Sequence, residues 1–168
     1  MASLLTSPYN LDEATKKSAD VNTALESALE SVNFPKNIDV ITNLQPSLLL
    51  AQLDPFLLKD IFFNVMKNAK EAMANEGGQL QVISKLSSTR SDILVTIADS
   101  GQGIPREMRE KLFKPFSSTK SSTGGMGMAL FNAYNILQAI GGNITLEDSD
   151  EPGARFIIRI PLPPLQVK

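Results

Sequence analysis

Apolar residues recur at intervals of three and four in three stretches of the chain, a spacing that gathers them on one face of a helix. We predict helices over residues 20–32, 55–74 and 126–140. The second has a clear start, because Asp54 can cap free backbone N–H groups and Pro55 loses no hydrogen bond at the first helical position. The glycine pair at 77 and 78 is predicted to end it.

Apolar residues at every second position predict strands in the intervening stretches. These are residues 37–44, 79–86, 92–98, 143–147 and 154–160. A short polar link at 87–91 predicts that the second and third strands form an antiparallel hairpin. The interleaved helices and strand pairs indicate an α/β fold, a two-layer sandwich whose mixed, mostly antiparallel sheet of about five strands is covered by about three helices.

The length of 168 residues suits one domain of ordinary size. Residues 1–19 lack periodicity and are expected to form a flexible lead-in, with the folded domain over 20–165. No apolar run is long enough to cross a bilayer, and no secretory signal is present. We therefore expect a soluble domain in the cytoplasm that makes no contact with the membrane.

Two missing residue types limit the chemistry of the chain. It has no cysteine and no histidine. This excludes disulfides, thiolate or imidazole metal sites and a Ser-His-Asp triad. The net charge of -2 and the scattered lysines argue against nucleic-acid binding.

Two asparagines of the second predicted helix are candidates for a metal site. Asn64 and Asn68 are four residues apart, so both amides point to the same side of the helix. An amide oxygen suits Mg²⁺, which takes most of its other ligands from phosphates and water. The alternative is that both amides only bond to neighbouring backbone, as most buried polar groups do.

Two glycine-containing turns enclose a polar, serine-rich connection. The first follows a strand, where Asp99 offers a fixed acceptor and Gly101 and Gly103 allow a ligand close to the backbone. The second opens a helix, where Gly125 and Gly127 would expose N–H groups to a phosphate. Each alone is also an ordinary turn sequence. Neither matches the phosphate loop or the dinucleotide fingerprint.

The connection between the turns carries a cation and two aromatic residues. Lys120 can reach a phosphate or remain a solvated surface lysine. Phe113 and Phe116 would be unfavourable in water, so we expect them to anchor the connection to the body or to a partner. The whole stretch from 99 to 130 is predicted to be a nucleotide-binding lid.

Taken in order, these segments resemble the ATP-binding catalytic domain of sensor histidine kinases, within the superfamily of gyrases, ninety-kilodalton heat-shock chaperones and mismatch-repair ATPases. The segment NVMKNAKEAM at 64–73 is similar to the asparagine box, in the form seen in nitrogen-control kinases. The segments at 99–104, 113–120 and 125–128 match the first glycine box, the F-x-P-F-x-x-T-K box and the second glycine box. The resemblance covers about residues 21–163 and implies the Bergerat ATP-binding fold.

The resemblance also implies the role of each residue, with ATP and Mg²⁺ as the bound groups. Asp99 accepts a hydrogen bond from the adenine amino group, and Asn68 holds the metal, which Glu71 assists through water. Asn64 helps to line the pocket. Further nucleotide-binding positions are Gly101, Gly103, Ile104, Phe116, Thr119, Lys120, Gly125, Met126, Gly127 and Met128.

One departure from the superfamily pattern bears on the reaction. Its ATPases place a glutamate general base four residues before the metal asparagine, and this chain has Asn64 there. Without that carboxylate, phosphoryl transfer to another group is favoured over hydrolysis. Since the chain has no histidine, the phosphoacceptor is expected on a separate dimerisation hairpin of the full-length kinase, to which residues 1–19 could be the linker.

The resemblance implies a response-regulator receiver domain as the second partner, and we expect the isolated domain to be a monomer. No catalytic residue is assigned within the chain. The alternatives are a stand-alone ATPase or serine kinase of the same fold, as in anti-sigma-factor kinases, and a non-catalytic ATP sensor.

Overall fold

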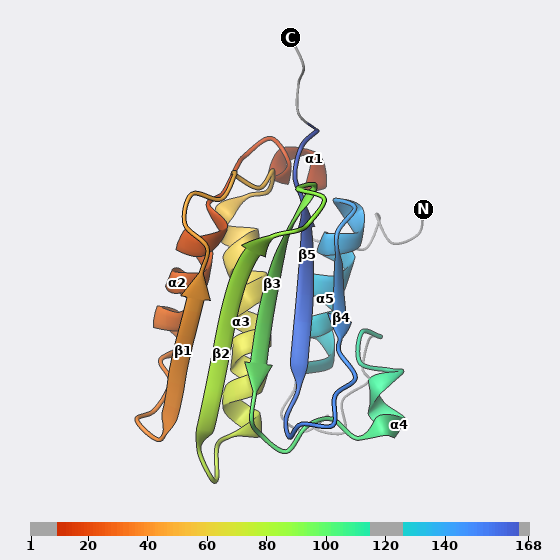
Figure 1. Cartoon of the computed structure of the whole chain (residues 1–168). Coiled ribbons are helices and arrows are strands. Elements are labelled where there is room, and N and C mark those ends of the chain that lie inside the picture. The colour runs from red at the N-terminus through yellow and green to blue at the C-terminus, as the bar shows by residue number, and fades with distance from the viewer. Residues whose placement is uncertain (1–9, 115–125, 165–168) are drawn as a thin grey trace.

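The computed structural model describes residues 10–114 and 126–164 (Figure 1). Five strands form one sheet in the order β1-β2-β3-β5-β4. Strand β1 runs parallel to β2, and the other neighbours are antiparallel. The strands are β1 (Ile38–Leu44), β2 (Gly78–Leu86), β3 (Asp92–Asp99), β4 (Asn143–Leu146) and β5 (Arg155–Pro161).

Three longer helices lie behind one face of the sheet, and two short ones lie near its ends (Figure 1). The longer helices are α2 (Val21–Val32), α3 (Pro55–Ala72) and α5 (Met126–Ala139). The short ones are α1 (Leu11–Ala14) and α4 (Arg106–Arg109). The predicted two-layer α/β sandwich with a mixed sheet is confirmed, including the hairpin of β2 and β3.

Three features differ from the sequence-based expectation. Helix α3 ends at Ala72, two residues earlier than predicted, and α4 was not predicted. Residues 10–19, expected to be part of a flexible lead-in, contact the body of the domain. Ala14 and Ala19 are buried, and Ala19 forms an isolated bridge with Ala51.

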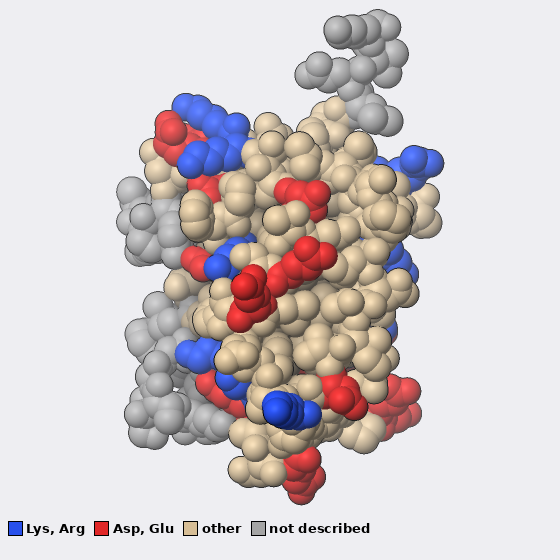
Figure 2. Space-filling model, turned by 90° about the vertical axis from the view of Figure 1, so that its left-hand side faces the viewer, with Lys and Arg blue, Asp and Glu red and all other residues tan. Residues whose placement is uncertain are grey.

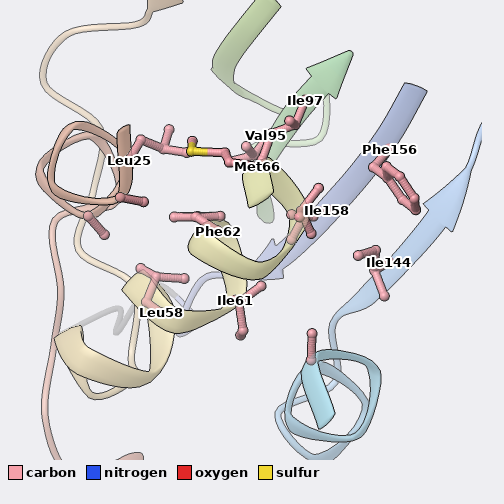
Figure 3. Packing of buried hydrophobic residues seen from close by; sticks show 14 of the residues in the cluster. Leu25, Leu58, Ile61, Phe62, Met66, Val95, Ile97, Ile144, Phe156 and Ile158 are labelled. Carbon is pink, nitrogen blue, oxygen red and sulfur yellow. The ribbon is translucent and has the colours of Figure 1, made fainter. Parts of the chain in front are cut away.

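The core lies between the sheet and the three longer helices. Alternate residues of β2, β3, β4 and β5 are buried toward the helices, whereas β1 adds only Ile38 to the buried set. Figure 3 shows side chains from α2 and α3 meeting those of β3, with β4 and β5 beyond. The labelled members are Leu25, Leu58, Ile61, Phe62, Met66, Val95, Ile97, Ile144, Phe156 and Ile158.

Helix α3 is the central helix of this layer. Its start is fixed by Asp54, whose Oδ1 accepts a hydrogen bond from the Phe56 N–H at 2.8 Å. It packs against α2 on one side and α5 on the other. Lys70 fixes its far end to α2, because Nζ donates to the carbonyls of Val32 and Asn33. The side chains of α3 are therefore held in a defined position relative to the sheet.

Among the described residues, the large apolar side chains that are exposed lie on β1, on the segment that follows it and at the start of α3. They are Val40, Ile41, Leu49, Leu50 and Phe56. Figure 2 shows the side of the molecule formed by the β1 edge, where mostly uncharged surface surrounds a few acidic and basic side chains. Among the described residues, no helix is both long and apolar enough to span a bilayer.

Candidate nucleotide-binding site

The turn that follows β3 is built around a buried carboxylate. Asp99 is 9% exposed. Its Oδ1 accepts hydrogen bonds from the N–H groups of Gly101 at 2.9 Å and Ala154 at 3.3 Å. Burial raises the pKa of Asp99, and the two backbone donors offset part of that rise. Within the described part of the chain Oδ2 receives no hydrogen bond, so one oxygen remains for an external donor.

Close packing explains two glycines at this turn. A Cβ on Gly101 would stand 2.7 Å from the carbonyl oxygen of Ala72, at the end of α3. Gly153, in the connection just before β5, has a φ of +96° and packs directly on the backbone of Asp99. The carboxylate is thus enclosed by the end of α3 and by the connection between β4 and β5.

Ser100 joins this turn to β2. Its Oγ accepts from the Gln79 N–H at 2.8 Å, and its own N–H donates to the Gln79 carbonyl at 3.1 Å. The hydroxyl also points at the sulfur of Met73, 3.8 Å away. The position of Asp99 is therefore fixed by β2, β5 and the end of α3 together.

The structure places Asn64 and Asn68 on α3, both half-buried. Ala72, which contacts Gly101, lies one turn beyond Asn68, so this amide is near the turn that carries Asp99. Neither amide bonds to another described residue, and no described side-chain polar atom is buried without a partner. Within the described part of the chain, neither amide is therefore used by neighbouring backbone, and their role in binding stays a prediction.

The predicted aromatic anchor is confirmed for Phe113. Its ring stacks on Tyr134 of α5 with centroids 5.6 Å apart, and it meets Phe156 of β5 edge-on at 6.4 Å. The chain that enters the serine-rich connection is thus attached to the core. Phe116, Thr119, Lys120 and Gly125 lie outside the described residues.

Helix α5 begins at Met126, so Gly127 and Met128 fall in its first turn, as predicted from the second glycine box. Figure 1 shows this start at the same end of the molecule as the C-terminal ends of β3 and α3. Gly103 and Ile104 belong to the turn after Asp99, and Ile104 packs partly on the core. Glu71 is exposed on α3. The predicted segments therefore meet at one end of the fold.

A concavity of about 410 Å³ lies on the outer face of the sheet, next to the turn that carries Asp99. Its walls include Gln81, Ala98 and Arg155, which share a row on the face opposite the helices. The concavity reaches Asp99 from the outer face of the sheet, whereas the asparagines of α3 lie on the face covered by the helices. The concavity and the predicted nucleotide site are therefore on opposite faces.

Sequence reasoning missed several residues that shape the site. Ala154, Gly153 and Arg109 lie outside the glycine boxes, and no local pattern marks Ala154 or Arg109. Ser100 lies inside the first box, yet its bonds to Gln79 depend on the pairing of β2 with β3. Only the glycine at 153, within a turn-rich segment, offered a signal.

Comparisons with known proteins agree with this geometry. The family model for histidine kinase-, DNA gyrase B- and HSP90-like ATPases matches residues 53–164. Sensor histidine kinase ZraS of Klebsiella oxytoca is 31% identical over 149 residues, which are 87% of this chain and 31% of the relative. Sporulation kinase A of Bacillus subtilis is 34% identical over 104 residues, 62% of this chain and 16% of the relative.

Solved structures show the same fold. The nucleotide-free catalytic domain of histidine kinase ThkA superimposes with a TM-score of 0.72 at 28% identity, covering 88% of this chain and 98% of that one. A mycobacterial sensor histidine kinase, MprB, gives a TM-score of 0.75 at 23% identity, covering 89% of this chain and all of that one.

The chain belongs to the histidine kinase-, DNA gyrase B- and HSP90-like ATPase family. Within it, the relatives and structural neighbours identify the chain as an ATP-binding catalytic domain of the sensor histidine kinase type. It spans about a third of the length of the ZraS relatives. The nitrogen-control subtype stays a prediction.

Proposed function

We propose that this domain binds ATP with Mg²⁺ and supplies the γ-phosphoryl group to a histidine on a separate dimerisation hairpin of the full-length kinase. The observation that carries the proposal is the arrangement of Asp99. Two backbone donors hold Oδ1, and Oδ2 is left to accept a hydrogen bond from the adenine amino group. A guanine, which carries a carbonyl at that ring position, would face the carboxylate with another acceptor.

The residues near the turn fit a magnesium ion that takes few ligands from the protein. Among the described residues, no three His, Cys, Asp or Glu side chains converge to form a metal cluster. Asn68 offers a free amide oxygen, and phosphate oxygens and water complete such a shell. Glu71 would orient a bound water. When bound, the ion neutralises phosphate charge, and Asn64 and Asn68 orient the triphosphate on the face of α3.

The remaining predicted contacts are assigned by resemblance alone. Gly101, Gly103 and Ile104 would border the adenine. The phosphates would be covered by residues on and before the start of α5, namely Phe116, Thr119, Lys120, Gly125, Met126, Gly127 and Met128. From the sequence pattern alone the ATP-binding domain spans residues 20–165, and the contacts of residues 10–19 extend it at that end. The partners are the phosphoacceptor hairpin and a response-regulator receiver domain, and the location is the cytoplasm.

Transfer is favoured over hydrolysis by the position of Asn64. A half-buried amide stands where the superfamily's ATPases have a general base, and an amide cannot accept a proton from water. The matching test uses the chain and a hairpin domain carrying the phosphoacceptor histidine. We expect labelled phosphate to appear on the hairpin, with little free phosphate and none on this chain.

The controls separate binding from transfer. Calorimetry with ADP, with and without Mg²⁺, is expected to show binding that the metal strengthens. Asp99→Asn is expected to weaken ADP binding by a loss of the order of 1–3 kcal/mol or more, because it presents a donor to the adenine amine. Unchanged affinity in this variant would contradict the adenine assignment, and metal-independent binding without transfer would favour an ATP sensor.

A further inference from the structure

The two halves of the turn after β3 are held by different contacts. In the first half, backbone bonds join Asp99 to Ala154 and Ser100 to Gln79. In the second half, the chain passes Gly103 at a φ of +75° and reaches Ile104, whose carbonyl accepts a hydrogen bond from Nε of Arg109 at 3.1 Å. This second contact comes from a side chain.

Arg109 joins the turn to a distant part of the chain. It is the last residue of α4, and its NH1 group pairs with Oδ1 of Asp148 at 2.6 Å. Asp148 follows β4, in the same connection that ends at Ala154. The planar guanidinium has donors in a fixed fork, so it can serve the carbonyl and the carboxylate together.

The two contacts of Arg109 differ in environment. The side chain of Asp148 is 86% exposed, so solvent and salt screen the ion pair. The bond to the Ile104 carbonyl is partly buried, and that acceptor belongs to the turn itself. The carbonyl contact is therefore the one that fixes the turn, and the ion pair mainly orients the guanidinium.

We propose that Arg109 is a positioning residue for adenine recognition, acting through the Ile104 carbonyl. The inference rests on the proposed role of Asp99. The Arg109 bond to Ile104 fixes the far end of the turn, while the Ala154 N–H supports Asp99 Oδ1 at its near end. A shift of the turn would misalign the proposed bond between Asp99 and the adenine amino group, and a hydrogen bond weakens steeply with misalignment. The proposed contacts to the phosphates are made by other segments and would not change.

The test compares ADP and GDP affinities by calorimetry for matched variants. Arg109→Met removes both donors at similar length. We expect ADP affinity to fall about tenfold, as for loss of one partly buried charge-assisted bond, while the weaker GDP affinity stays unchanged. The ratio of the two affinities falls accordingly, which a general loss of folded protein would not produce.

Two further variants separate the contacts. Asp148→Asn removes only the ion pair and is expected to change ADP affinity less than about twofold. Arg106→Met makes the same chemical change on the exposed side of α4 and is expected to have no effect. If Arg109→Met fails to fold, Arg109→Lys replaces it, because lysine keeps the charge beside Asp148 and lacks the Nε–H.

The outcomes are distinct. An equal loss in Asp148→Asn and Arg109→Met, an equal fall for ADP and GDP, or unchanged ADP binding in the Arg109 variants overturns the inference. If wild type binds ADP and Asp99→Asn does not, the proposed function stands even when the inference about Arg109 is overturned. If wild type does not bind ADP at all, both fail together.

Discussion

Asp99 combines a buried position with a charge. Its carboxylate has two backbone donors on one oxygen and none from the described residues on the other. Burial raises its pKa, which means that the ionised form is less stable in the folded chain than in water. A buried charge that lowers the stability of the folded chain at neutral pH is typical of a residue that serves ligand binding instead of folding.

The first prediction concerns Asp99→Asn and pH. Because the folded pKa is raised, the stabilising contribution of the protonated form is present below the unfolded value of 3.8 and is lost as the pH rises through the folded pKa. Asparagine keeps the acceptor for Gly101 and Ala154 and carries no charge. We expect the variant to be more stable than wild type at about pH 7, with a difference that shrinks toward about pH 4.

Urea unfolding of both proteins across this range measures the difference. A difference that does not vary with pH would show that Asp99 titrates normally in the folded chain. A variant less stable than wild type at neutral pH would show that the bonds from Gly101 and Ala154 need the charge.

At the scale of elements, local signals decided how much the sequence predicted. Asp54 and Pro55 mark the start of α3, and the structure has it there. The strand pairs were predicted to within a residue or two because each alternates clearly. Helices α1 and α4 have four residues each, too few for a periodic pattern to appear. Phe113 was predicted as an anchor from its apolar surface, whereas its partner rings required the fold.

The second prediction concerns the cap of α3. Burial tends to raise the pKa of Asp54, but the bond from the Phe56 N–H and the ion pair with Lys17 outweigh it, so its pKa is lowered. Its contribution to stability is therefore present above the unfolded value of 3.8 and is lost as the pH falls through the folded pKa.

Asp54→Ala is expected to lower the unfolding free energy by about 1 kcal/mol at neutral pH, as for other N-cap losses. Asp54→Asn is the matched control, because asparagine also caps and loses only the exposed partner Lys17. Urea unfolding at neutral pH compares the three chains. An equal loss in both variants would assign the effect to the ion pair instead of the cap.

At the scale of the molecule, the sequence could not show how distant segments meet. The bond from Ala154 to Asp99 and the pair of Arg109 with Asp148 join residues 55 and 39 positions apart. Both depend on β5 lying between β3 and β4 in the sheet. The asparagine and glycine boxes were predictable because each is a local segment. The side chains that hold those segments in place come from elsewhere in the chain.

The last prediction concerns the N-terminal limit of the folded domain, which the sequence placed at residue 20. Ala19 and Ala51 exchange two backbone hydrogen bonds of 2.8 and 2.9 Å, and Ala14 is also buried. Lys17 pairs with the cap residue Asp54. A chain that begins at residue 20 loses all of these contacts and leaves the backbone groups of Ala51 without their partners.

We expect that chain to lose about 2 kcal/mol or more of unfolding free energy, from two hydrogen bonds and the apolar surface uncovered. A chain that begins at residue 10 keeps every contact just described and is expected to match the full chain. Urea midpoints of the three chains measure the effect. Equal midpoints for the chains beginning at 10 and 20 would show that residues 10–19 only lie on the surface, whereas the expected loss makes them part of the domain that positions α3.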